Sequence, residues 1–414
     1  MKETLTIDMV QSVAVGALAL VTGMFLTRKI AWLQKFCIPS PVSGGILFSV
    51  ITLLIYSFLG IEVNFDSTLK DIFMLVFFTS VGFQSNLKVM KRGGKALVMM
   101  LILLVTIIVI QNLTPLAITK LMDINPLIGM AAGSISMAGG HGTAGGFSSV
   151  LEGMGLTGAG TISMAAATFG LIAGSVIGGP VAERLIHKHL TSEHLEPKDY
   201  TMDPAMLGIE SEESTPAGME KHMVSNEQEF QQYASATYSI LIAMGLGTIA
   251  SWLLQHTGIT FPTYFGALIM AAIIRNVAEA TPLGKKLHYE HITSVGNIAL
   301  SLFLGMAMIS LKLWELQSLA LPLITILVAQ VAVMILLTSF VAFKMLGSDY
   351  DAAVLVAGIC GFGLGATPNA MANMNAVCYK YHYTVKPFLV VPIIGAMFVD
   401  LLNTGFITLF LNII

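Results

Sequence analysis

Charged residues are scarce in this sequence. Only 11% of its 414 residues are Asp, Glu, Lys or Arg, and 55% are hydrophobic, whereas soluble domains carry roughly 25% charged residues. The formal net charge is −3, and the basic residues are spread over short loops, which excludes the basic patch typical of nucleic-acid binding. The composition predicts a protein that lies mostly in a lipid bilayer and has no nucleic-acid partner.

Cysteine is also rare, with only Cys37, Cys360 and Cys378 in the chain. Their spacing matches no metal-ligand motif and three cysteines cannot all pair, so we expect free thiols. The sequence also has no nucleophile, base and orienting residue at a recognisable spacing. We therefore expect no enzyme, no structural metal and no organic cofactor.

Long apolar runs are what the sequence has instead, and each can supply the roughly 20 helical residues that cross a hydrocarbon core. The first run, Val10 to Leu26, is followed by no small-residue cleavage signature, so we expect it to remain as the first helix. We predict an all-α membrane protein. The expected spans are 9–27, 41–60, 70–87, 96–119, 159–184, 234–255, 261–278, 294–312, 318–343 and 387–411.

These spans form two halves of five, and a Gly-rich stretch precedes the last span of each half. Because the number of spans per half is odd, the second half enters the membrane from the opposite side, as in inverted-repeat transporters. Similar positions recur at an offset of 222 to 224 residues: Pro39 and Gly44 with Pro262 and Gly266, Gly82 with Gly305, and Thr143 with Thr367.

The predicted organisation therefore has three parts. An N-terminal inverted repeat covers 1–186 and a C-terminal one covers 233–414, and a linker at 187–232 to which we assign no chemistry joins them. Each repeat is predicted to contain one re-entrant hairpin, at 125–155 and at 350–378. A full crossing there would move all later loops to the other side of the membrane and remove the excess of basic residues from the cytoplasmic loops.

The orientation follows from the basic residues, which favour cytoplasmic loops. With the N-terminus outside, 17 of the 21 Lys and Arg lie on the inner side, and only Lys2, Lys70, Lys120 and Lys312 lie outside. We therefore expect both termini in the periplasm and the linker in the cytoplasm.

The two Gly-rich stretches, 136–150 and 358–377, are the predicted ligand site. Each Gly in a helix costs about 1 kcal/mol relative to Ala, and broken backbone at membrane depth occurs only where protein or a watery cavity satisfies it. Thr367 is expected to cap a half-helix that begins at Pro368, and Thr143 holds the corresponding place in the first stretch. Such helix ends suit a carboxylate, so we expect an anionic substrate.

Oxygen donors near these ends suit Na+, and Asn369 and Asn373 share one helix face. The alternative for glycine is close helix packing, which we prefer for Gly170, Gly174 and Gly178. His141 is either a neutral hydrogen-bond donor or a ligand contact. The substrate candidates in the two stretches are Gly140, His141, Gly142, Thr143, Gly365, Ala366, Thr367, Asn369 and Asn373, and the Na+ candidates are Gly139, Gly361, Gly363, Asn373, Asn375 and Asp400.

Asp400 lies in the middle of the last predicted span, and Asn403 and Thr404 follow it. An ionised Asp near the bilayer centre costs roughly 2.5 to 3.5 kcal/mol. Its partner is expected to be a substrate ammonium group or a coupling cation, with a structural pairing to Asn or backbone as the alternative. Asn403 is a further substrate candidate. Arg275 either reaches a substrate carboxylate or anchors its span at the cytoplasmic surface.

Three strings carry a family resemblance: GGHGTAGG at 139–146, GFGLGATPNAMANMNAV at 361–377 and IIGAMFVDLLNTG at 393–405. With these and with PSPVSGGIL at 39–47, the chain resembles the bacterial sodium/glutamate symporters over essentially its whole length. The resemblance implies Na+-coupled uptake of L-glutamate across the bacterial inner membrane. It also implies ten spans with two opposed re-entrant hairpins, a homodimer and an elevator-like displacement of the substrate.

Without the resemblance, the residues support only an anionic or amphoteric solute moved with a cation. Transport of another small carboxylate remains an alternative. A channel is another, because channels also use opposed re-entrant loops, but Asp400 and the Asn-rich tip favour occlusion around a bound solute.

Overall fold

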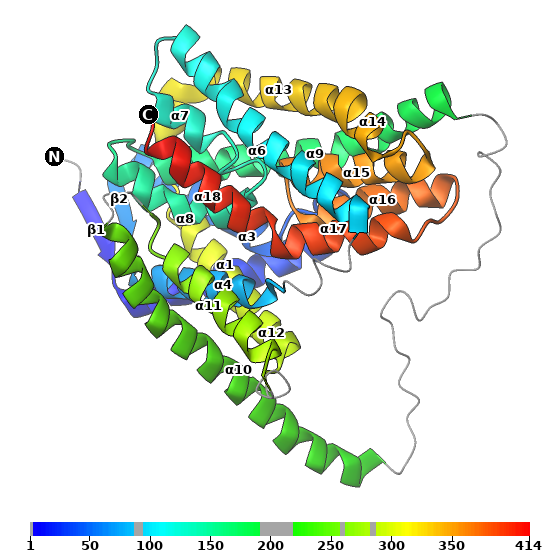
Figure 1. Cartoon of the computed structure of the whole chain (residues 1–414). Coiled ribbons are helices and arrows are strands. Elements are labelled where there is room, and N and C mark those ends of the chain that lie inside the picture. Colours follow the sequence, from blue (N-terminus) through cyan, green and yellow to red (C-terminus); the bar gives the residue numbers. More distant parts are fainter. Residues whose placement is uncertain (1–2, 87–93, 191–217, 257–260, 282–286) are drawn as a thin grey trace.

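The computed structural model describes residues 3–86, 94–190, 218–256, 261–281 and 287–414. The chain is predominantly helical, as predicted (Figure 1). The first half contains α1 (Met9–Lys29), α2 (Ala31–Lys35), α3 (Ser40–Leu59), α4 (Thr68–Gln84), α6 (Gly94–Leu121), α7 (Pro126–Ala131), α8 (Gly140–Gly153) and α9 (Ala159–His189).

The second half begins with α10 (Gly218–Gln255), so part of the predicted linker is helical, and residues 191–217 of that linker lie outside the described residues. The other elements are α11 (Phe265–Glu279), α12 (Tyr289–Ile309), the 3-10 helix η4 (Leu313–Leu319), α13 (Ala320–Leu337), the π-helix η5 (Thr338–Ala342), α14 (Phe343–Leu346), α15 (Tyr350–Leu364), α16 (Thr367–Lys380), α17 (Lys386–Met397) and α18 (Val399–Leu411).

Two short strands are an exception to the all-α prediction. β1 (Glu3–Ile7) and β2 (Ile61–Phe65) form a parallel pair in which Glu3 lies opposite Ile61. The hydroxyl of Ser12 at the start of α1 accepts a hydrogen bond of 2.9 Å from the Asp66 N–H, which ties the end of β2 to α1. Both strands are rich in Thr, Ile and Val, residues that favour strands, but five residues are too few to predict a strand between apolar spans.

All ten predicted spans coincide with helices. Within the described ranges, seven helices are long and apolar enough to cross a membrane, and the bent pair α17–α18 makes an eighth. The two others, α4 with 17 residues and α11 with 15, are shorter than the roughly 20 residues of a full crossing.

The helices pack as two bundles, and each bundle takes helices from both halves of the chain. The first, which we call the six-helix bundle, contains α1, α3, α4, α10, α11 and α12. The second, which we call the broken-helix bundle, contains α6 to α9 and α13 to α18 and lies above the first in Figure 1.

Glycines allow the closest helix crossings of the six-helix bundle. A Cβ on Gly44 of α3 would collide with the backbone of α1 at Ala19 and Gly23, and a Cβ on Gly266 of α11 would collide with the backbone of α10 at Gly247. The same kind of crossing therefore occurs once in each half, at positions separated by the sequence offset noted above.

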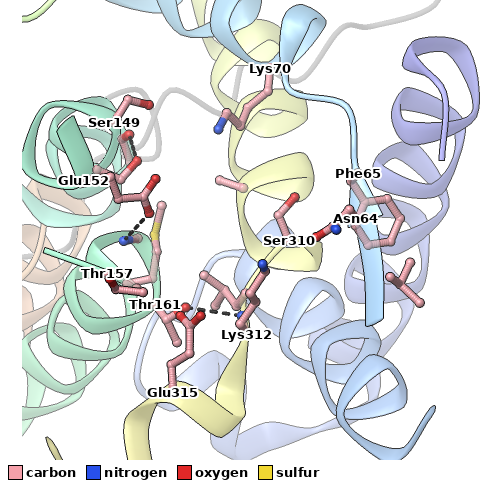
Figure 2. A pocket seen from close by; sticks show the side chains of 18 residues that line it. Asn64, Phe65, Lys70, Ser149, Glu152, Thr157, Thr161, Ser310, Lys312 and Glu315 are labelled. Atoms are coloured by element: carbon pink, nitrogen blue, oxygen red, sulfur yellow. Dashed lines mark hydrogen bonds between the residues drawn. The ribbon is translucent and has the colours of Figure 1, made fainter. Parts of the chain in front are cut away.

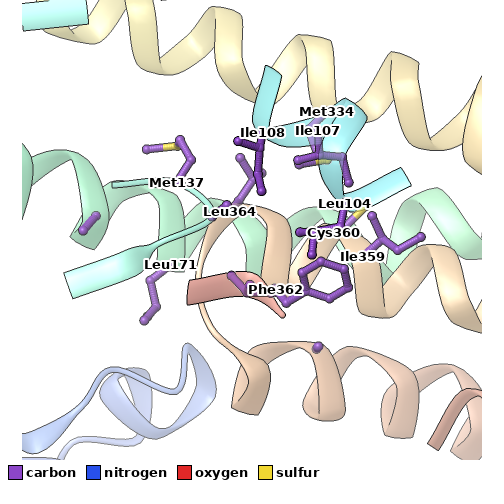
Figure 3. Packing of buried hydrophobic residues seen from close by; sticks show 14 of the residues in the cluster. Leu104, Ile107, Ile108, Met137, Leu171, Met334, Ile359, Cys360, Phe362 and Leu364 are labelled. Atoms are coloured by element: carbon purple, nitrogen blue, oxygen red, sulfur yellow. The ribbon is translucent and has the colours of Figure 1, made fainter. Parts of the chain in front are cut away.

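Glycines also bring α9 against α15 and α16. A Cβ added to Gly170 would collide with the Leu364 carbonyl, and one added to Gly174 would meet the Cys360 carbonyl. A Cβ added to Gly178 would collide with the Asn373 side chain. The close packing predicted from their spacing of four residues is confirmed. Figure 3 shows the buried apolar side chains that surround this crossing, among them Leu171, Leu364 and Cys360.

Both Gly-rich stretches contain two helices separated by a break. In the second stretch Gly361 packs on Ala370 and Gly358 on Met374, so residue numbers rise on α15 as they fall on α16, and the two helices are antiparallel. In the first stretch, turns at residues 132–139 separate α7 from α8. The predicted breaks are present, but they are narrower than expected, because Gly361 and Gly363 lie within α15 rather than in a turn.

The last predicted span is not a continuous helix. α17 and α18 are bent by 46° at a break between them. Gly395 lets α17 approach α16 closely, because a Cβ on Gly395 would collide with the Thr367 side chain. Asp400 lies in the first turn of α18, directly after the break, rather than in the middle of a helix.

Candidate functional site

The breaks of the two Gly-rich stretches meet. Gly140 has a φ of +58°, a conformation that favours glycine, and an added Cβ would lie 2.9 Å from the Gly365 carbonyl oxygen. Gly365 and Ala366 form the break between α15 and α16. We call Gly139, Gly140, Gly365 and Ala366 the tip junction.

Asp400 lies beside the tip junction, next to Thr143 of α8. The Thr143 hydroxyl donates to the Asp400 carboxylate at 3.5 Å, and the Thr143 side chain also packs on Gly139. Among the residues that the structure describes, no Lys or Arg forms an ion pair with Asp400. Its position near the N-terminus of α18 favours the carboxylate, and an ionised Asp at membrane depth also calls for a cation.

Asn403, one turn further along α18, also reaches the tip junction. Its side-chain N–H donates to the Ser134 carbonyl at 2.9 Å, and a Cβ on Gly139 would lie 2.7 Å from this nitrogen. The bond fixes the amide orientation, because only the nitrogen can donate to a carbonyl. The amide oxygen of Asn403 is then buried without a hydrogen-bond partner.

Ser134 contributes a second unpartnered oxygen at the same place. Its N–H donates to the Asn112 side-chain oxygen at 3.1 Å, and its own hydroxyl, fully buried, has no partner. A buried polar atom without a partner costs roughly 1 to 3 kcal/mol, and two such oxygens on residues that contact each other suit a small cation. The sequence analysis missed Ser134, which lies two residues before the predicted stretch and whose only signal was a serine next to a Gly-rich run.

His141 acts as a hydrogen-bond donor in this arrangement. Its Nε2 lies 3.0 Å from the Thr168 hydroxyl, whose own proton is donated to the Met164 carbonyl. Thr168 can therefore only accept from His141. Gly142 lies on the opposite side, where its Cβ would contact Phe77 of the six-helix bundle at 3.2 Å.

The cap predicted at Thr367 is displaced by one residue. α16 begins at Thr367, and Ala366, with extended backbone angles, holds the cap position, so Pro368 is the second helical residue rather than the first. The Thr367 side chain makes no capping hydrogen bond and packs on Gly395 of α17 instead.

Asn369 and Asn373 share one face of α16, as predicted, and that face is turned toward α9. Asn369 donates to the Leu171 carbonyl at 2.9 Å and to the Ser175 hydroxyl at 2.5 Å, and Asn373 donates to the Gly174 carbonyl at 2.9 Å. The Asn369 oxygen is buried without a partner. Both side chains thus join the second hairpin to α9.

Three other Na+ candidates make contacts elsewhere, although the Gly361 carbonyl oxygen also lies 3.1 Å from the place of a Cβ on Gly365. The Gly363 carbonyl accepts a hydrogen bond of 2.5 Å from the Gln111 side chain. Gly361 packs on the backbone of Ala370, and Asn375 lies on an exposed part of α16. Of the predicted residues, the structure brings together Gly139, Gly140, Thr143, Gly365, Ala366, Asp400 and Asn403.

Arg275 is held near the other end of the six-helix bundle. It forms an ion pair of 2.7 Å with Glu279, one turn along α11, and its guanidinium lies 3.2 Å from the Tyr289 ring centroid. It lines a cavity of about 360 Å³ together with Pro392 and Met397 of α17. Its guanidinium is therefore already paired with a carboxylate and an aromatic ring of the six-helix bundle.

A larger cavity of about 440 Å³ lies between the two bundles. We call it the outer cavity, because its lining residues lie at the helix ends predicted to be periplasmic. Gly145 of α8 lines it, and Thr143 at the tip junction lies only two residues away along the same helix. Figure 2 shows its polar and charged side chains: Asn64, Lys70, Ser149, Glu152, Thr157, Thr161, Ser310, Lys312 and Glu315. Sequence reasoning missed this cavity because no motif joins its scattered elements.

Comparison with known proteins covers nearly the whole chain. A family model described as sodium/glutamate symporter matches residues 5–383. The sodium/glutamate symporter of Escherichia coli K12 is 39% identical over 407 residues, which are 98% of this chain and 98% of that protein. The symporter of the same name from Haemophilus influenzae is 35% identical over 401 residues, 97% and 96% of the two chains.

One solved structure also resembles the chain at low similarity. A sodium proton antiporter from Methanocaldococcus jannaschii has 15% sequence identity and a TM-score of 0.43, with 97% of this chain and 99% of that chain covered. A likeness this weak supports no conclusion about fold or function.

Proposed function

Because the chain belongs to the sodium/glutamate symporter family, we propose that it carries L-glutamate into the cell together with Na+. The observation that carries this proposal is the tip junction, where two broken helix pairs meet beside a partly buried carboxylate and buried oxygens without hydrogen-bond partners. Discontinuous helices near the bilayer midplane are where secondary transporters bind solute and coupling ion.

Na+ is proposed to bind between α18 and the first hairpin. The donors are the Asp400 carboxylate, the Asn403 amide oxygen and the Ser134 hydroxyl, of which the last two have no hydrogen-bond partner. Na+ therefore gives these buried oxygens the partner that they lack. This set leaves out Gly361 and Gly363, which lie within α15, and Asn375, which is exposed on α16.

The glutamate carboxylates are proposed to bind at the N-termini of α8 and α16, where unsatisfied N–H groups favour an anion. α8 begins at Gly140 and α16 at Thr367, so the two N-termini lie on either side of the tip junction. A carboxylate close to bound Na+ would also gain from the opposite charge. Asn369 and Asn373 are proposed to hold the second hairpin on α9 and so to position this site.

We also propose that the two halves are inverted repeats, with the two Gly-rich stretches as re-entrant hairpins. The paired crossings at Gly44 with Gly23 and at Gly266 with Gly247 support the duplication. The protein is further proposed to lie in the bacterial inner membrane with both termini periplasmic and to form a homodimer, as the family resemblance implies.

An elevator-like displacement of the broken-helix bundle is supported by its contact with the six-helix bundle. α8 presents Gly142, Gly145 and Gly146 to the aromatic side chains of Phe77, Phe303 and Tyr264. The glycines leave most of this α8 surface without side chains, and Phe147 of α8 is an exception that packs edge-on against the Tyr264 ring. Few side chains would therefore have to repack as one bundle slides past the other.

Radiolabelled glutamate uptake into proteoliposomes tests the proposal. An inward Na+ gradient should drive glutamate above its outside concentration, and an equal K+ gradient should not. Equilibration without accumulation would indicate a channel, and equal uptake in K+ would exclude sodium coupling.

A further inference from the structure

The outer cavity is lined by two of the few basic residues that are expected on the outer side of the membrane. Only four of the 21 Lys and Arg are expected on the outer side, as the preference of basic residues for the cytoplasm predicts. Two of the four, Lys70 and Lys312, line this one cavity. Lys120 lies exposed at the end of α6, and Lys2 lies outside the described residues.

Lys70 is a cation with little compensation from the protein. Its side chain is 17% exposed, and the Asp71 carboxylate lies 3.8 Å away, beyond hydrogen-bond distance. Figure 2 shows the side chain extending from α4 toward α8, where Ser149 and Glu152 lie. A largely buried ammonium group with a distant partner favours binding of an anion from solution.

The opposite wall of the outer cavity is acidic. Glu152 of α8 accepts a long hydrogen bond of 3.5 Å from the Gly160 N–H, and the Glu315 carboxylate packs on Gly158, so both acids lie at the N-terminus of α9. Burial raises the pKa of Glu315, Lys312 lowers it, and Glu152 and Glu62 raise it further. Lys312 forms an ion pair of 2.6 Å with Glu62 and therefore offsets this acidic charge only in part.

We propose that the outer cavity is a second binding site for an α-amino dicarboxylate, which occupies it before reaching the tip junction. Lys70 holds a carboxylate of the solute, and Glu152 with Glu315 holds its ammonium group. The cavity of about 440 Å³ lies within the 300 to 1,000 Å³ typical of small-molecule sites. This inference rests on the proposed function, because it concerns the same solute at an earlier step.

The test compares Lys70→Gln with Lys120→Gln, which removes an outer lysine remote from the cavity. Glutamate uptake from the outer side is measured in oriented proteoliposomes. Lys70→Gln should raise the KM for outside glutamate about three- to fivefold, as expected for one partly exposed charge pair. The maximal rate and the Na+ concentration for half-maximal uptake should not change. Lys120→Gln should behave like the wild type.

Two further readouts separate binding from a structural effect. Lys70→Arg should restore the KM, and the KM of Lys70→Gln should depend less on KCl concentration than that of the wild type, because salt screens the lost attraction. Glu152→Gln, a second variant that keeps the side-chain size, should raise the KM similarly.

Other outcomes would overturn the inference. The first is an unchanged KM in both Lys70→Gln and Glu152→Gln. The second is a fall in maximal rate that is equal in both variants and that Lys70→Arg does not rescue. The third is a change in Na+ dependence alone, which would make the cavity a cation path. Failure of the wild type to accumulate glutamate would instead overturn the proposed function itself.

Discussion

The Na+ site proposed at the tip junction depends on a few individual oxygen atoms. Asn403 and Ser134 each carry a buried oxygen without a hydrogen-bond partner, and Asp400 lies one turn from Asn403. By contrast, Asn375, which the sequence also suggested as a Na+ ligand, is exposed on α16. Both asparagines are candidates from the sequence, and only Asn403 has a buried oxygen that could take part in the proposed Na+ site.

Asn403→Ala should raise the Na+ concentration for half-maximal uptake about tenfold or more, since each 1.4 kcal/mol of lost binding is a factor of ten. Asn375→Ala should leave it unchanged. Both are measured as Na+ titrations of glutamate uptake. A change in Asn375→Ala without one in Asn403→Ala would place Na+ at the exposed face of α16.

Gly140 is required by backbone conformation as well as by space. Its φ of +58° and its contact with the Gly365 carbonyl both exclude a side chain. Gly140→Ala should lower the free energy of unfolding by about 1 to 2 kcal/mol and reduce uptake. Gly153→Ala, at a position with open space around it, is the control and should be neutral. Thermal unfolding in detergent that is equal for both variants would contradict this account.

At the scale of elements, the sequence predicted all ten spans and the two Gly-rich breaks, because long apolar runs and dense glycine are local signals. It did not predict the bend after α17, which no local signal in the sequence marks. It missed the β1–β2 pair and the outer cavity for a similar reason, since both combine residues from separate parts of the chain.

The crossing of α9 with the second hairpin offers a matched pair of glycines. A Cβ on Gly178 would collide with the Asn373 side chain, whereas Gly179 has open space around it. Gly178→Ala should destabilise the protein by about 1 to 3 kcal/mol through overpacking, and Gly179→Ala should not. The midpoint of thermal unfolding compares them, and an equal effect of both would show that α9 does not depend on this contact.

At the scale of the whole molecule, the two bundles each contain helices from both halves of the chain. The outer cavity and the cavity beside Arg275 both lie at contacts between the bundles, the first lined by α8 and α12 and the second by α11 and α17. The tip junction lies within the broken-helix bundle. The proposed elevator-like displacement would move the tip junction relative to the six-helix bundle.

The predicted topology is tested with single cysteines in a background without the three native ones. A cysteine at residue 65, at the end of β2, should react with a membrane-impermeant maleimide from the periplasm. A cysteine at residue 210, outside the described residues, should react only from the cytoplasm. Reaction of both from one side would refute the arrangement of five spans in each half.

The most direct test of the central claim is the effect of Asp400→Asn on ion and substrate dependence. The substitution keeps the size of the side chain and removes the charge, so the protein should insert and purify like the wild type. We predict that the Na+ concentration for half-maximal glutamate uptake rises at least about tenfold, because the carboxylate is the only charged donor of the proposed Na+ site. Uptake with unchanged half-saturation for both Na+ and glutamate would contradict a coupling site at the tip junction.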